Sequence, residues 1–173
     1  MTYLRARLLP PVFLLALGCA ARPAAAPPPS SDALGWIVGG WKGERVEPST
    51  GDRDPISSEC RSVLGGLGEE EEIVVGTGPK AYRGVYLQVF DPKVQKSVLM
   101  YVNNMRRQFA RLEGAASSER GEWESTTSIP PRRSKLVYER LDANSWRRTQ
   151  RISEDDGGTW KTLFVDELRR SAE

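Results

Sequence analysis

The chain contains no histidine among its 173 residues. This absence excludes Ser-His-Asp and Cys-His catalysis built from this chain alone, because both need an imidazole as the base. It also removes the commonest transition-metal ligand and the usual axial ligand of haem. Only two cysteines are present, so a structural zinc site is not expected either. We therefore expect no cofactor and no metal site, and we do not expect an enzyme.

An excess of charge of one sign is also missing. The chain has 25 Lys and Arg against 23 Asp and Glu. A basic excess is the usual footprint of nucleic-acid binding, so no nucleic-acid partner is expected. A long apolar run is lacking as well. The stretch from Leu8 to Leu17 is about ten residues long and contains two prolines, whereas a membrane-spanning helix needs about 20 apolar residues.

The N-terminal segment has the layout of a secretory signal. Arg5 and Arg7 precede the apolar stretch, and Gly18 and Cys19 follow it. This segment resembles the lipobox of bacterial lipoproteins, in which the cysteine after the cleavage site accepts diacylglycerol. The resemblance implies cleavage before Cys19, a lipid anchor there and a place in the bacterial cell envelope, at the outer membrane because no aspartate follows two residues later. An ordinary secreted protein and a retained anchor are the alternatives.

Composition divides the chain into three parts. Residues 1–18 are the predicted signal peptide, residues 19–34 are a Pro/Ala-rich tether with too few large apolar residues to fold, and residues 35–173 are one domain. Acylation of Cys19 would leave Cys60 without a disulfide partner in the chain. Cys60 is in phase with Ile56 and Leu64 on a predicted strand, so we expect a buried thiol.

Period-two alternation of β-branched and aromatic residues recurs along the whole domain, and no segment predicts a convincing long helix. We expect about ten strands, at 36–46, 56–64, 72–76, 82–90, 97–103, 107–112, 121–127, 135–141, 145–153 and 159–168. Short turns between consecutive strands favour an all-β, antiparallel up-and-down β-barrel, with a sandwich as the alternative. Several strands are apolar on both faces, which indicates either cover on the outside or an apolar interior.

Gly39-Gly40-Trp41 on the first predicted strand is a Gly-x-Trp motif. Together with the Gly84–Asp91 hairpin strand and a late Asp-Gly-Gly-x-Trp turn, it resembles the uncharacterised bacterial lipocalin-like (calycin) families. The resemblance implies a barrel whose base is closed by Trp41, with Arg169 or Arg170 stacked on the indole. Relatives of the nitrobindin type bind haem through a histidine, so that function does not carry over to this chain.

The segment from Ser153 to Trp160 fits the Asp-box pattern, with its defined positions at Ser153, Asp155, Gly157, Thr159 and Trp160. An Asp-box is a β-hairpin in which the Asp and Ser side chains bond the turn backbone, and Asp and Gly suit such turns. It occurs once here, and the domain is too short for a propeller. We interpret it as a structural hairpin and not as the remnant of a glycosidase.

Alternation also suggests a ligand site inside the barrel. An inward Arg148 near Tyr86, Gln88, Tyr101 and Tyr138 would recognise a carboxylate. Asn103 and Gln150 complete this candidate set. The alternative is that the arginines pair outside the barrel, with Glu122, Glu124 and Glu139. The acidic run at 69–72 is expected to be a solvated loop beside an edge strand.

Three functions remain open. The first is a lipid-anchored envelope protein that holds a small amphipathic or apolar ligand in its barrel. The second is a non-enzymatic lipoprotein that docks an envelope protein through its outer surface. The third is an enzyme using the paired carboxylates Glu122 and Glu124, which an ordinary exposed strand would also present. An empty volume in the barrel would favour the first, and a filled barrel with an exposed apolar patch the second.

Overall fold

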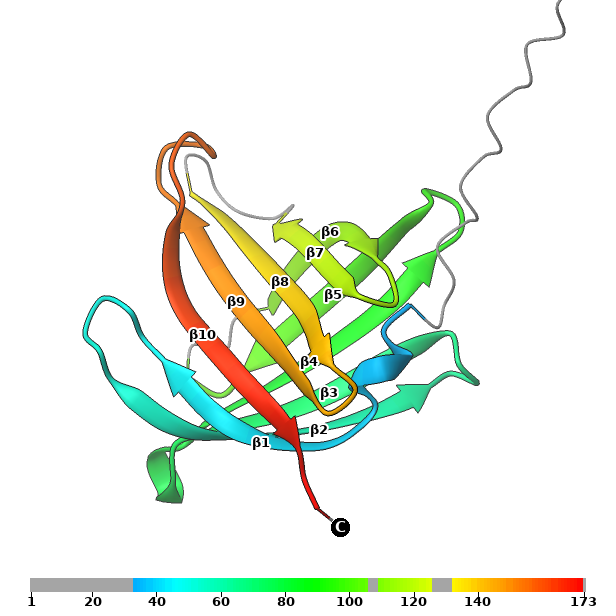
Figure 1. The fold of residues 1–173 in the computed structure, drawn as a ribbon. Helices are drawn as coiled ribbons and strands as arrows, with labels where there is room; N and C mark the ends of the chain where they lie inside the picture. The colour runs from blue at the N-terminus through cyan, green and yellow to red at the C-terminus, as the bar shows by residue number, and fades with distance from the viewer. Residues whose placement is uncertain (1–32, 106–108, 126–131, 173) are drawn as a thin grey trace, which may run out of the picture.

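The computed structural model describes residues 33–105, 109–125 and 132–172. These residues form ten antiparallel strands that close into one barrel (Figure 1). The strands are β1 (Gly39–Val46), β2 (Arg53–Val63), β3 (Gly68–Val75), β4 (Tyr82–Asp91), β5 (Lys96–Asn103), β6 (Phe109–Ala116), β7 (Arg120–Ser125), β8 (Arg133–Asp142), β9 (Ser145–Ser153) and β10 (Lys161–Arg170). Two short 3₁₀ turns, η1 (Gly35–Ile37) and η2 (Gly78–Lys80), precede β1 and β4.

Each strand pairs with the next along the chain, and β1 pairs with β10 to close the sheet. The closing register runs from Trp41 opposite Arg170 to Val46 opposite Val165. Gly43 on β1 lies opposite Leu168 on β10. A methyl group at this position would lie 1.8 Å from the carbonyl oxygen of Glu167. The prediction of an all-β, up-and-down barrel of about ten strands is therefore confirmed.

Strand direction defines two rims of the barrel (Figure 1). The chain enters β1 and leaves β10 at the same rim, which we call the N-terminal rim and which also carries the β2–β3, β4–β5, β6–β7 and β8–β9 hairpins. The β1–β2, β3–β4, β5–β6 and β9–β10 connections lie at the opposite rim. At the N-terminal rim, Ala33 and Leu34 are buried, with Leu34 fully inaccessible. Both side chains belong to the core cluster of the barrel.

Aromatic side chains fill the interior near the N-terminal rim. Trp146 contacts Trp41 edge-to-face at 6.1 Å and Tyr138 at 5.1 Å between ring centroids. The Trp41 Nε1–H donates to the carbonyl oxygen of Ile37 at 2.6 Å, which links the indole to η1. Arg169 and Arg170 are both exposed, and the Arg170 guanidinium lies 4.3 Å from the centre of the Trp41 ring. Such a cation–π contact contributes about 0.5–2 kcal/mol.

Candidate functional site

Five charged residues occupy inward-facing positions of the barrel, and four of them, Arg45, Glu71, Arg148 and Asp166, are hydrogen-bonded to one another. Arg45 follows Trp41 in phase on β1, Glu71 precedes Ile73 on β3, Arg148 follows Trp146 on β9, and Asp166 precedes Leu168 on β10. Their exposed fractions are 7% for Arg45, 2% for Glu71 and 0% for Arg148 and Asp166. Because side chains alternate between the two faces of a strand, a charge in phase with core residues must enter the interior.

These four residues form one hydrogen-bonded network, which we call the lumen network. Arg45 donates to both oxygens of Asp166, through Nε at 2.6 Å and Nη2 at 2.8 Å. Arg148 donates through Nε to Asp166 Oδ2 at 2.7 Å and through Nη1 to Glu71 Oε1 at 2.9 Å. Glu71 also accepts from the hydroxyls of Ser58 at 2.6 Å and Tyr138 at 2.8 Å. Two cations therefore face two carboxylates with no net charge.

The electrostatics of the lumen follow from this pairing. Burial alone lowers the pKa of Arg148, but Glu71 and Asp166 outweigh it and raise that pKa well above its usual value. Burial also raises the pKa of Tyr138 well above its usual value, and Glu71 raises it further. Burial raises the pKa of Tyr86 to about 12 against the opposing effect of Arg148. At neutral pH the arginine is charged and both tyrosines are neutral, and the Tyr138 hydroxyl donates to Glu71.

Aromatic rings lie close to both guanidinium groups. Arg148 lies 5.1 Å from the centre of the Tyr86 ring and 5.6 Å from that of Trp146. Arg45 lies 3.6 Å from the centre of the Phe164 ring. The two guanidinium groups and the aromatic rings beside them therefore occupy this part of the lumen, and they leave little room for a bound molecule.

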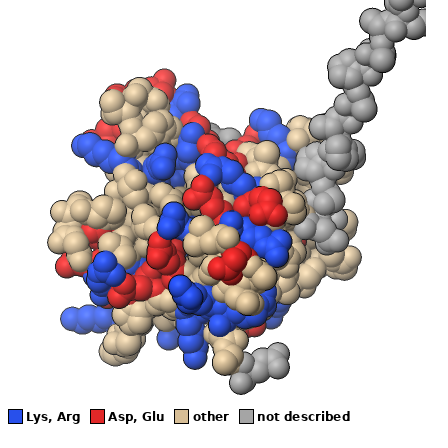
Figure 2. Space-filling model, in the orientation of Figure 1, with Lys and Arg blue, Asp and Glu red and all other residues tan. Residues whose placement is uncertain are grey.

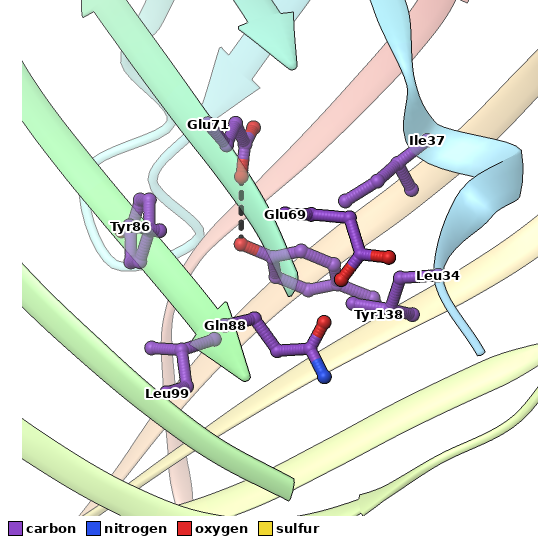
Figure 3. A pocket seen from close by; sticks show the side chains of 8 residues that line it. All are labelled: Leu34, Ile37, Glu69, Glu71, Tyr86, Gln88, Leu99 and Tyr138. Carbon is purple, nitrogen blue, oxygen red and sulfur yellow. Dashed lines mark hydrogen bonds between the residues drawn. The ribbon is translucent and has the colours of Figure 1, made fainter. Parts of the chain in front are cut away.

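A small cavity lies beside Tyr138 in the part of the barrel that the structure describes (Figure 3). It is lined by Leu34, Ile37, Glu69, Glu71, Tyr86, Gln88, Leu99 and Tyr138. Leu34 and Ile37 close it from the N-terminal segment, while Glu71 and Gln88 come from β3 and β4 (Figure 3). The cavity has a volume of about 10 Å³. On the same scale one water molecule needs roughly 10–15 Å³, so the cavity has room for about one water. An amphipathic ligand does not fit this space.

The predicted interior residues divide into three groups. Tyr86, Gln88 and Tyr138 line the cavity. Tyr101 stacks on Tyr86 with 4.5 Å between ring centroids. The other two residues of the set lie away from the cavity. Asn103 accepts from the backbone N–H of Met105 near the opposite rim, and Gln150 donates to the hydroxyl of Ser134 at 3.0 Å.

The carboxylates that Arg148 recognises belong to the protein itself. Sequence reasoning did not single out Glu71, Asp166 and Arg45, and the prediction of a solvated loop at 69–72 is wrong. These residues belong to β3, where Glu69 and Glu71 point inward and are 3% and 2% exposed, while Glu70 and Glu72 point outward. A signal for this was present, because Glu69 and Glu71 are in phase with Ile73 and Val75.

Cys60 lies among the core residues and is 2% exposed. Its thiol is free. Burial raises the pKa of this thiol well above its ordinary value, and the neighbouring carboxylate of Glu71 raises it further. A protonated, inaccessible thiol is a poor nucleophile, so Cys60 acts as a small core residue.

The hairpin between β9 and β10 has the hydrogen bonds of an Asp-box. The Ser153 hydroxyl accepts from the N–H of Gly157 at 2.8 Å and donates to Asp155 at 2.6 Å. Asp155 accepts from the N–H of Thr159 at 2.8 Å and from its hydroxyl at 2.7 Å. These bonds, led by that from Ser153, lower the pKa of Asp155 to about 2. Lys135 lies 4.8 Å from the centre of the Trp160 ring. All of these contacts hold a turn at the opposite rim.

The outer face over β7 to β10 is covered by ion pairs, and charges of both signs alternate over it (Figure 2). Glu122 pairs with Lys135 at 3.1 Å, Glu124 with Arg133 at 2.8 Å, and Glu167 with Arg147 at 2.7 Å. Arg120 pairs with both Glu122 and Glu139. The two glutamates considered as catalytic carboxylates are thus held by cations on an exposed strand. The hydrogen bond from Arg120 leads the effects that lower the pKa of Glu122.

The outer face of β4 and β5 is different, because it is apolar. Opposite the inward Tyr86, Gln88 and Leu99, six aliphatic side chains point outward in three cross-strand pairs. These pairs are Val85 with Val102, Leu87 with Met100, and Val89 with Val98. Phe109 on β6 extends the array, since it pairs with Val102. Val102 is 46% and Phe109 64% exposed, whereas Val98 is covered by its neighbours. We call these seven residues the apolar face.

The described residues contain no group of three or more side chains suited to a metal ion. No helix in the same ranges has the length and apolar character needed to cross a membrane. Cys19, the predicted lipidation site, lies outside the described residues. No protein-family model matches this sequence, and a search of curated proteins finds no match to it either.

Proposed function

We propose that this chain is a lipid-anchored interaction protein of the bacterial envelope, which docks a partner protein through the apolar face of its barrel. In this proposal Cys19 carries the lipid, residues 20–32 tether the domain, and the barrel is a lipocalin-like scaffold with a filled interior. The outer membrane is the proposed location, as the residues after Cys19 suggest.

The observation that carries the proposal is the contrast between the interior and the outside of the barrel. The interior satisfies its own arginines with Glu71 and Asp166, and its cavity holds about one water molecule. A barrel that carries ligands needs a lumen large enough to enclose them. The filled lumen thus favours docking over the other proposal, in which the barrel holds a small amphipathic molecule.

The apolar face on the outside of the barrel also supports docking of a partner protein. A sheet face in contact with water normally alternates apolar-in with polar-out residues, and the outward positions of β7 and β9 are all polar here. On β4 and β5 the outward positions are aliphatic as well, from Val85 to Val89 and from Val98 to Val102. Exposed apolar patches bordered by charges mark interaction sites on soluble domains. Glu72 on β3 and Arg111 on β6 border this patch, next to Val85 and Met100.

Site-specific photo-crosslinking in living cells tests the proposal. A photoreactive residue at Val102 is expected to give one discrete adduct with an envelope protein. The same residue at Glu167, on the charged face, is expected to give none. Leu87→Glu, which places a charge in the centre of the apolar face, is expected to abolish the Val102 adduct without changing the circular dichroism spectrum. Equal adducts from both positions would contradict the proposal.

Native mass spectrometry of the purified full chain separates the two proposals. Docking through the outside predicts the mass of the processed, lipidated chain with nothing further bound. A small molecule that co-purifies at one equivalent and is lost on unfolding would favour the ligand-holding barrel instead. A chain that keeps residues 1–18 and carries no acyl groups would contradict the lipid anchor itself.

A further inference from the structure

Two neighbouring hairpins at the N-terminal rim end in exposed aliphatic side chains. Leu64 and Leu67 form the tip of the β2–β3 hairpin and are 68% and 61% exposed. Val94, in the β4–β5 hairpin, is 52% exposed. The hairpins are consecutive around the rim, because β3 pairs with β4 and Gly68 lies opposite Val89. Three aliphatic side chains thus project from one sector of the barrel's edge.

Leu64 also adopts a backbone conformation that is unfavourable for a leucine. Leu64 has a φ of 55°, in the left-handed region that favours glycine. A leucine is unfavourable in that conformation, and this one makes no compensating contribution to the core. Gly65 and Gly66 follow it with φ of 69° and 90°, so the turn already contains residues suited to it. Neither packing nor backbone preference accounts for a leucine here, whereas contact with an apolar phase outside the protein would.

The position of the first described residue points to that phase. Ala33, the first described residue, is buried at this same rim (Figure 1). If Cys19 carries the lipid, about 13 residues separate the two, a reach of roughly 40 Å at ~3.1 Å per residue. An anchor this close raises the effective concentration of the rim at the surface, so weak contacts suffice for binding. Lys93, exposed beside Val94, adds a cation that anionic headgroups attract.

We propose that the N-terminal rim rests on the lipid surface, with Leu64, Leu67 and Val94 inserted among the headgroups. The inference depends on the lipid anchor of the proposed function. It also orients the domain. In this orientation the strands extend away from the membrane, and the opposite rim with Phe109 is the part farthest from it. The apolar face lies on the side of the barrel, where a partner protein can reach it.

Fluorescence in a pure lipid system tests this orientation. The full, lipidated chain is reconstituted in vesicles of phosphatidylethanolamine and phosphatidylglycerol. An environment-sensitive fluorophore is attached to Val94→Cys or, as the matched control at the opposite rim, to Phe109→Cys. Cys60 is 2% exposed and does not compete for the label. We expect a lipid-borne quencher to quench the probe at residue 94 and to leave the probe at residue 109 unaffected.

Serine variants separate rim contact from an effect of the probe. Leu64→Ser with Leu67→Ser is expected to lower the ratio of lipid-bound to free orientations about tenfold or more, because two apolar contacts are lost. Val102→Ser with Met105→Ser, which removes two exposed apolar side chains at the opposite rim, is expected to leave that ratio unchanged. All four positions are solvent-exposed, so near-ultraviolet circular dichroism is expected to stay that of the parent chain.

The outcomes distinguish the rim contact from the anchor. If the chain co-floats with the vesicles but neither probe is quenched, the proposed rim contact is wrong and the lipid anchor is still supported. Quenching at residue 109 in place of residue 94 overturns it too, as does shielding of residue 94 that requires added envelope proteins. A chain that does not float with the vesicles overturns both the anchor and the rim contact.

Discussion

Removal of the Asp166 carboxylate is the most direct test of the lumen network. Asp166 is fully buried and accepts hydrogen bonds from both Arg45 and Arg148. In Asp166→Ala, Arg45 loses both of its hydrogen-bond acceptors and Arg148 keeps only Glu71, so one positive charge of the network is left uncompensated. Breaking a buried ion pair in this way costs about 3–5 kcal/mol. This is a large part of the 5–15 kcal/mol by which a domain is typically stable.

The adjacent residue provides the control for this change. Glu167 lies on the same strand and pairs with Arg147 at 2.7 Å, but its side chain is 59% exposed and that of Arg147 39%. Exposed pairs contribute about 0–1 kcal/mol, because water already solvates both charges. Glu167→Ala is therefore expected to change the free energy of unfolding by less than about 1 kcal/mol. The two variants remove the same kind of charge and differ mainly in burial.

Urea unfolding followed by tryptophan fluorescence measures both variants. A double-mutant cycle then tests whether the cost comes from the unpaired charge. Arg148→Met is expected to cost less in the Asp166→Ala background than in the parent chain, because it then removes an uncompensated cation. If Asp166→Ala and Glu167→Ala unfold at the same urea concentration, or if the effects of Asp166→Ala and Arg148→Met simply add, the reasoning about the lumen is refuted.

Three further changes probe other parts of the barrel. Gly43→Ala places a methyl 1.8 Å from the Glu167 carbonyl oxygen and is expected to cost about 3 kcal/mol in urea unfolding, against little for Gly35→Ala, whose methyl meets nothing within 4 Å. Asp155 has its pKa lowered from 3.8 to about 2, so it adds stability above pH 3.8 that is lost as the pH falls toward 2. The fall in unfolding free energy over this range should be shallower in Asp155→Asn, and an equally steep fall would contradict the assignment. Burial raises the pKa of Tyr86 from 10.0 to about 12, so its contribution, present below pH 10, is lost as the pH rises toward 12. Tyr86→Phe should lose less stability over that interval, and an identical alkaline profile would show that Tyr86 ionises as freely in the folded chain as in the unfolded one.

Strand position and order could be predicted from the sequence because they depend on local signals. The alternation in 82–90 and 97–103 places each strand, and the Asp-Pro-Lys turn at 91–93 forces antiparallel pairing between them. The segment 107–112 fits a helix and a strand equally well in isolation. Described from residue 109 onward, it is strand β6, because pairing with β5 and β7 satisfies its backbone.

The lumen network was harder to predict because its members lie far apart in sequence. Glu71 and Arg148 are 77 positions apart, and Arg45 and Asp166 are 121 apart. Alternation predicts which face a residue occupies, but only barrel closure determines which strands face each other across the lumen. The acidic run at 69–72 shows the difficulty. Composition alone suggests solvent, while the phase shared with Ile73 places every second glutamate inside.

The first and last strands of the barrel pair with each other at the N-terminal rim. Trp41 lies opposite Arg170, and the N–H of Ser171 donates to the carbonyl oxygen of Gly40 at 2.9 Å. A linker could therefore join the end of β10 to the start of β1, and new termini could open in the turn at 47–52, at the opposite rim. Such a circular permutant keeps every strand pairing but moves the point of attachment to the other end of the molecule. If Cys19 carries the proposed lipid, fusing the lipid signal to the new N-terminus would reverse the orientation of the domain relative to its anchor, so that orientation becomes an experimental variable independent of the fold.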